Sequence, residues 1–97
     1  LLKKQNSENK LYGAICAAPA VVLEHHGLLQ GKNATCHPRF ADQLHSRTHA
    51  GERVVIDKNC VTSKGAGTSI EFALELLGIL MGEDKKKEVA AGMAIEA

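Results

Sequence analysis

A strand-like segment runs directly into a helix-like segment near the start of this 97-residue chain. Apolar, strand-type residues occupy 11–15 (LYGAI), and a helical pattern follows at 17–26 (AAPAVVLEHH). Only Cys16 separates the two, so we expect it at the tip of a sharp strand-to-helix turn, as in a nucleophile elbow. Backbone N–H groups at the start of a helix favour the thiolate form of a cysteine. The sequence therefore predicts a cysteine that attacks electrophiles at neutral pH.

The next residues predict the crossover of a parallel sheet. Gly27 stands where a left-handed residue would end the helix, and a short strand is expected at 33–36, followed by His37. A strand, a helix and a second strand in this order favour a parallel crossover, which brings the carboxyl ends of both strands to one edge of the sheet. We therefore expect His37 to face Cys16.

The remainder of the chain predicts a hairpin and two further helices. Turn-forming residues between two apolar runs indicate an antiparallel hairpin. Apolar residues at helical spacing after Thr68 indicate a packed helix that ends at Gly82, and the charged run that follows is expected to be a linker. In chain order, the expected elements are a polar helix end at 1–9, a short helix and loop at 39–52, hairpin strands at 53–57 and 60–63, and helices at 69–81 and 86–95.

The composition argues against several classes of function. A net charge of +1, three aromatic residues and no tryptophan disfavour a nucleic-acid surface. No apolar run reaches the length that spans a bilayer, and the first residues do not resemble a signal peptide. We therefore expect an intracellular, cytoplasmic chain without nucleic-acid or membrane partners, with targeting to an organelle left open.

The other candidate side chains fit structural roles better than chemical ones. Cys36 and Cys60 have no CxxC spacing, so we interpret them as packing residues rather than zinc ligands or disulfide partners. His45 and His49 stand four residues apart but lack a third ligand. The glycine-rich loop 65–67 lacks the Lys-Ser/Thr pair of a P-loop. We expect neither a metal nor an organic cofactor.

Three motifs follow one another in a specific order: AICAAP at 14–19, Cys-His-Pro at 36–38, and TSKGAGTSIEFAL at 62–74. This order closely resembles the C-terminal half of the ThiJ/PfpI superfamily, and within it the DJ-one branch, which includes plant members. The resemblance implies a flavodoxin-like (Rossmann-like) α/β sandwich with a central, mostly parallel sheet. Residues 1–97 would form the C-terminal half of that single domain, and the N-terminal half would lie in a missing segment or a companion chain.

Matched position by position, the resemblance also implies a catalytic site. Cys16 falls on the family's reactive, easily oxidised cysteine, Ala17 on a backbone N–H of its oxyanion site, and His37 on its active-site histidine. A glutamate that contacts the sulfur belongs to the other half of the domain. Lys64 and Ala66 are candidate substrate or loop contacts, but they replace an arginine and a proline. Lys64 lacks the planar fork with which arginine grips a carboxylate.

The function that the resemblance implies is a cofactor-independent glyoxalase or deglycase acting on methylglyoxal or glyoxal, with a homodimer as the expected assembly. This half alone is expected to be inactive. The alternative is a redox-sensing chaperone or binding protein regulated by oxidation of Cys16. A peptidase-like member is disfavoured because Ala17 replaces the histidine that usually follows the cysteine, and a glutamine amidotransferase because its final His–Glu pair has no counterpart.

Overall fold

Three short strands form the centre of the molecule in a computed structural model that describes residues 1–94. The strands are β1 (Tyr12–Ile15), β2 (Val54–Asp57) and β3 (Cys60–Ser63), in the spatial order β1-β3-β2. β1 runs parallel to β3, and β2 runs antiparallel to it. β3 is buried along its whole length because it has a neighbour on each side and a layer of helices on each face.

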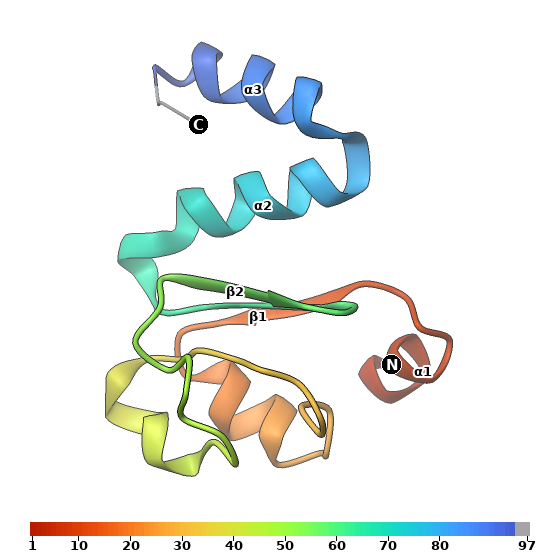
Figure 1. Cartoon of the computed structure of the whole chain (residues 1–97), viewed down its shortest axis with the longest axis vertical. Helices are drawn as coiled ribbons and strands as arrows, with labels where there is room; N and C mark the ends of the chain where they lie inside the picture. The colour runs from red at the N-terminus through yellow and green to blue at the C-terminus, as the bar shows by residue number, and fades with distance from the viewer. Residues whose placement is uncertain (95–97) are drawn as a thin grey trace.

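Helices cover both faces of this sheet (Figure 1). Helices α2 and α3 form a hairpin on one face, and two short helices, η1 and η2, lie on the other, while α1 stands beside the end of the sheet. The bounds are α1 Leu2–Ser7, the π-helix η1 Pro19–Glu24, the 3₁₀ helices η2 Pro38–Gln43 and η3 Ala66–Thr68, α2 Ser69–Met81 and α3 Glu83–Gly92. None of the helices within residues 1–94 combines the length and the apolar character needed to cross a membrane.

Much of the predicted order is confirmed. The hairpin forms with Asp57 opposite Cys60, and Lys58 takes a left-handed φ of 56° at its turn. Helix α2 spans the expected residues, and Gly82 ends it at a φ of 94°, which a residue with a side chain rarely adopts. The polar segment after His37 begins with a short helix, as expected, and continues as turns.

A buried lysine holds together the segments that meet at the start of β1. Lys32 is only 9% exposed, and its ammonium donates to Asn6 Oδ1 at 2.8 Å, to the Tyr12 hydroxyl at 2.7 Å and to Asn59 Oδ1 at 2.7 Å. Its three N–H donors are thereby satisfied, which is the condition for burying a charge without a large penalty. One side chain therefore joins α1, β1 and the β2–β3 turn.

The predicted strand at 33–36 is wrong. The Thr35 N–H donates to the side chain of Thr62 at 3.0 Å rather than to the backbone of a neighbouring strand. The Thr35 hydroxyl is within hydrogen-bonding distance of the carbonyls of Ala50, at 2.9 Å, and Glu52, at 2.7 Å. The segment therefore packs on the sheet instead of joining it, and the parallel partner of β1 is β3.

Two helix boundaries also differ from the prediction. The helix expected at 17–26 is observed as the shorter π-helix η1, and the Leu28 N–H closes a wide turn on the Leu23 carbonyl at 2.8 Å. The charged run after Gly82 is helical rather than a linker, since acidic residues stabilise the first turn of α3. Residue 95, where that helix was expected to end, lies outside the described residues.

We expect Gly13→Ala to lower the free energy of unfolding by about 1–3 kcal/mol, the usual range for overpacking. A Cβ at this position would lie 2.8 Å from the Val61 carbonyl oxygen and 3.3 Å from Phe72 Cζ, so the strand pair or α2 would have to move. Urea unfolding of the full-length protein measures the change. Gly67→Ala is the matched control because its Cβ would meet nothing within 4 Å, and an equal loss in both variants would contradict the prediction.

Candidate active site

Cys16 occupies the turn between β1 and η1 and is held there from two sides. Its N–H donates to the Ser63 carbonyl at 3.0 Å, and its own carbonyl accepts the His37 N–H at 2.6 Å. Its φ of 66° lies in the left-handed region, which residues other than glycine enter only when the surrounding structure enforces it. The residue is partly exposed, unlike the other two cysteines.

The backbone beyond the cysteine offers a free donor. None of the hydrogen bonds within residues 1–94 uses the Ala17 N–H, although the Ala17 carbonyl accepts from Ala20 at 3.0 Å and Val21 at 2.9 Å. An unpaired N–H directly after a nucleophile is the position from which an oxyanion is stabilised. The geometry is therefore compatible with the oxyanion role implied for Ala17.

His37 lies beside the same turn through its backbone, and its ring is held in a defined orientation. Nδ1 accepts the Arg39 N–H at 3.1 Å, which leaves the proton of the neutral imidazole on Nε2. The ring is half-buried and packs edge-on against Phe40, with 6.2 Å between ring centroids. Nε2 is thus the nitrogen available for proton transfer.

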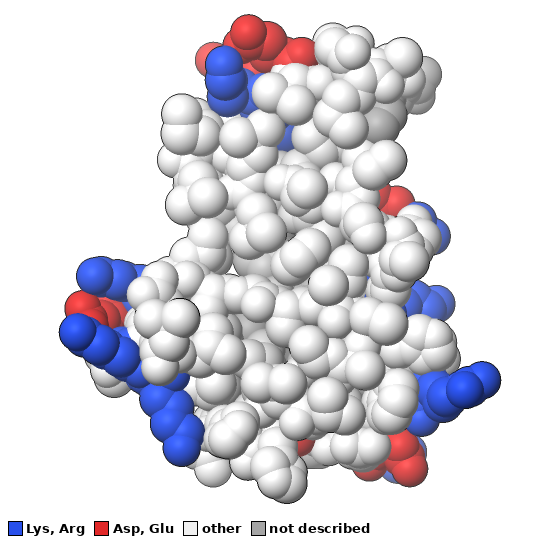
Figure 2. Space-filling model, turned by 180° about the vertical axis from the view of Figure 1, so that it is seen from behind, with Lys and Arg blue, Asp and Glu red and all other residues white. Residues whose placement is uncertain are grey.

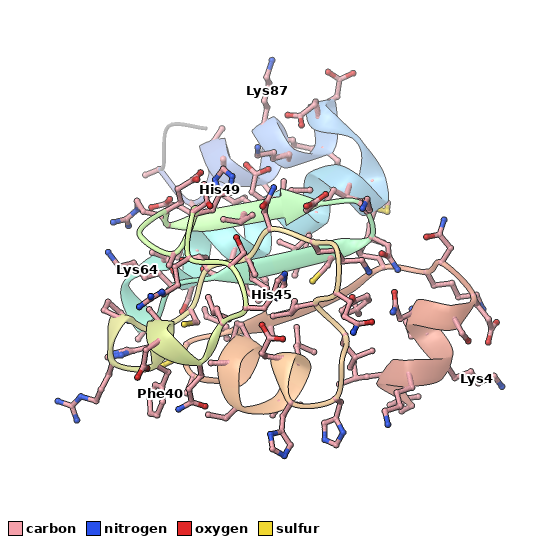
Figure 3. All side chains as sticks on the ribbon, turned by 60° about the horizontal axis from the view of Figure 1, so that its bottom comes forward. Lys4, Phe40, His45, His49, Lys64 and Lys87 are labelled. Carbon is pink, nitrogen blue, oxygen red and sulfur yellow. The ribbon has the colours of Figure 1, made fainter. Side chains whose placement is uncertain are left out.

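The loop that carries Lys64 and Ala66 follows β3 directly. The Lys64 N–H donates to the Arg53 carbonyl at 3.0 Å, and the Arg53 side chain donates to the Gly67 carbonyl at 3.1 Å while forming an ion pair with Glu71 at 2.6 Å. The Lys64 side chain takes part in none of the hydrogen bonds or ion pairs of residues 1–94. Figure 3 shows Lys64 at the same end of the molecule as Phe40, the neighbour of His37.

The other two cysteines differ from Cys16 in their surroundings. Cys36 and Cys60 are buried, at 0% and 1% exposure. Burial raises the pKa of both thiols, because the charged thiolate is poorly solvated in the core. Both positions agree with the packing role predicted for these residues.

Two of the remaining histidines pair with carboxylates. His45 Nδ1 lies 2.8 Å from Glu24 Oε1, and His49 contacts Glu52 within the same turn. Among the described residues, no three His, Cys, Asp or Glu side chains are grouped so as to hold a metal ion.

Residues 1–78 match the DJ-1/PfpI family. The chain belongs to this family. It is 51% identical over 85 residues to Protein DJ-1 homolog B of Arabidopsis thaliana, covering 88% of this chain and 19% of that protein. It is 41% identical over 90 residues to a Caenorhabditis elegans protein named glutathione-independent glyoxalase DJR-1.2, covering 88% of this chain and 46% of that one.

Solved structures agree with this assignment. The structure of oxidized Toxoplasma gondii DJ-1 superposes with a TM-score of 0.93 at 42% identity, covering 99% of this chain and 52% of that one. The flavodoxin-like α/β class is thereby confirmed. The chain spans about half of the Toxoplasma chain and a smaller share of the plant relative.

Sequence reasoning missed two parts of this site. The Arg53–Glu71 pair joins the residue before β2 to the first turn of α2, and the Ser63 carbonyl anchors the cysteine turn. No local sequence pattern predicts either contact, because each joins groups that are brought together only when the sheet has folded.

We expect iodoacetamide to alkylate Cys16 in the native full-length protein well before Cys36 or Cys60. Cys16 is partly exposed, whereas burial shields the other two thiols and raises their pKa. Peptide mass spectrometry after timed labelling measures the three rates separately. Labelling in urea is the control, since unfolding should make the rates similar, and faster native labelling of Cys36 would contradict the prediction.

We expect the Arg53–Glu71 pair to stabilise the loop at neutral pH and to fail in acid. Hydrogen bonds from Arg53 hold the pKa of Glu71 below its usual value of 4.5, so the contribution is present above that value and is lost as the pH falls through the lowered pKa. The thermal midpoint of Glu71→Gln should lie slightly below wild type at pH 7 and converge with it in acid. Glu88→Gln, which removes only an exposed contact with Lys85, should show no such convergence.

Proposed function

We propose that the chain is the cysteine-bearing half of a cofactor-independent glyoxalase that converts methylglyoxal or glyoxal to a 2-hydroxy acid. The observation that carries this proposal is the left-handed turn at Cys16, a partly exposed residue that is followed by an Ala17 N–H without a hydrogen-bond partner in residues 1–94. The nematode relative named a glutathione-independent glyoxalase supports the choice of substrate.

The first step joins the sulfur to the substrate. The Cys16 thiolate adds to the aldehyde carbon, and the electron pair of the C=O bond moves onto oxygen, where the Ala17 N–H donates to the developing oxyanion. Protonation of that oxygen gives a hemithioacetal. Covalent attachment keeps the small dicarbonyl fixed while its protons are moved.

The second stage transfers hydrogen between the two carbons. A base removes the proton from the former aldehyde carbon, and an acid returns one to the neighbouring carbon, so that the first is oxidised to a thioester while the second is reduced to an alcohol. His37 Nε2 and the glutamate of the other half would share this work. Water then cleaves the thioester, releasing lactate from methylglyoxal or glycolate from glyoxal and restoring the thiol.

The other half of the domain is the partner we propose for the open edge of the sheet. The N–H groups of Tyr12 and Cys16 point toward β3, so those of Gly13 and Ile15 point toward the unpaired side of β1. Figure 2 shows a broad face free of charge except at its margins. The large exposed apolar side chains among the described residues are Leu1, Val21, Val22, Ile56, Ile70, Ile79, Leu80, Met81 and Met93.

The greater length of the relatives supports the proposal that another half of the domain covers this edge, because the chain covers only 52% of the Toxoplasma structure. A half-domain that supplies more strands and a glutamate would cover the open edge and complete the site at once. The homodimer that the resemblance implies remains a prediction about the completed domain.

We expect the full-length protein to form lactate from methylglyoxal, and the 97-residue chain alone to form none. Cys16→Ser should abolish turnover, and His37→Gln should lower kcat by about 10²–10⁴-fold, the range for a lost acid or base. A coupled lactate assay measures both. Cys60→Ala and His45→Gln are matched controls outside the site. Retained turnover in Cys16→Ser would overturn the proposal.

A second candidate is a redox-regulated chaperone, favoured by the existence of an oxidized form of the Toxoplasma relative. In that case Cys16 would be oxidised to a sulfinate by a peroxide, and the added negative charge would alter binding. Absence of turnover, together with peroxide-dependent suppression of client aggregation that Cys16→Ser abolishes, would select this function over the glyoxalase.

A further inference from the structure

Two buried hydroxyls lie behind the cysteine turn without a role in the reaction described above. Ser63 ends β3 and is 0% exposed, while Thr68 ends η3 and is 4% exposed. Their Oγ and Oγ1 atoms are 2.5 Å apart. Burying two hydroxyl groups is favourable only when their hydrogen bonds are made, so the arrangement of these bonds shows what the pair holds in place.

Thr68 directs its hydroxyl into the loop rather than onto the helix that it precedes. It occupies the N-cap position of α2 but makes no side-chain capping hydrogen bond there. Instead, Oγ1 donates to the Gly65 carbonyl at 2.9 Å and accepts the Gly65 N–H at 3.2 Å. Thr68 Oγ1 also forms a hydrogen bond with the Ser63 hydroxyl, in which either group can be the donor, and the Arg53 carbonyl, at 3.2 Å, is a further acceptor for the Ser63 hydroxyl.

The two ends of this network reach the two candidate catalytic residues. At one end, the Ser63 carbonyl holds the Cys16 N–H at 3.0 Å. At the other, Gly65 is a near neighbour of the imidazole, since a Cβ added to it would be 3.9 Å from His37 Cδ2, an ordinary van der Waals distance. The Ser63–Thr68 hydroxyl pair is therefore a second connection between the two residues, in addition to the direct hydrogen bond from the His37 N–H to the Cys16 carbonyl at 2.6 Å.

We propose that the Ser63–Thr68 hydroxyl pair is a positioning element that sets Cys16 relative to His37. The inference rests on the proposed function, because it assigns the two residues a joint task. Thr68 acts through Gly65 and Ser63 acts through its own carbonyl, so neither hydroxyl needs to touch substrate. A misplacement of about 1 Å is enough to lower a rate by about 10²-fold.

The test compares hydroxyl removal with hydroxyl retention in the full-length protein. Thr68→Val keeps the shape of the side chain but removes all three hydrogen bonds, and we expect kcat for methylglyoxal to fall by about 10²-fold with KM unchanged. Thr68→Ser keeps the hydroxyl and should restore most of the rate. Ser69→Ala is the matched control, because its exposed hydroxyl bonds only the Ala66 carbonyl, at 2.9 Å, and should leave kcat unchanged.

The rate of Cys16 alkylation by iodoacetamide is the second readout, and it needs no glyoxalase activity. We expect it to fall in Thr68→Val and to recover in Thr68→Ser. A wild-type protein without turnover would refute the glyoxalase, while the alkylation series would still decide the positioning role. If Thr68→Val fails to fold by circular dichroism, Ser63→Ala replaces it. Wild-type alkylation in a folded hydroxyl-free variant, or an equal loss in Ser69→Ala, would overturn the proposal.

Discussion

The hydrogen bond from the Cys16 N–H to the Ser63 carbonyl is the contact on which the site depends. It extends the parallel pairing of β1 and β3 by one residue, into the turn where the backbone becomes left-handed. Parallel neighbours require a long crossover, and here residues 16–59 provide it. The stretch that carries His37 is part of this crossover, so the pairing that forms the sheet also returns the histidine to the cysteine.

Different kinds of hydrogen bond hold the chain in place at the two ends of β1. At the first end, Lys32 uses a buried ammonium to join α1, β1 and the hairpin turn through three neutral oxygens. At the second end, the buried hydroxyls of Ser63 and Thr68 hold the loop that follows β3. With both ends fastened, the strained φ of Cys16 is enforced by its surroundings rather than relieved.

Local sequence patterns were sufficient to predict the elements that have a clear hydrophobic periodicity or that are bounded by turn and cap residues. The elbow, the hairpin and the boundaries of α2 follow from residues adjacent in the chain. The stretch at 33–36 has strand-like residues, but a strand forms only where a partner edge is free, and the Thr35 N–H bonds the side chain of Thr62 instead. The contacts of Ser63, Thr68 and Arg53 link residues that no spacing rule connects. The family resemblance gave the candidate roles of Cys16 and His37, and their chemistry remains a prediction.

The open edge of β1 has a consequence for how the chain must fold. An unpaired strand edge beside uncharged surface is a template for other strands, including those of identical chains. Nothing in the described part of β1 blocks such pairing, since its sequence YGAI carries neither lysine nor proline. An exposed edge of this kind favours aggregation until another strand covers it. Synthesis of both halves in one continuous chain would therefore act as protection during folding as well as a means of completing the site.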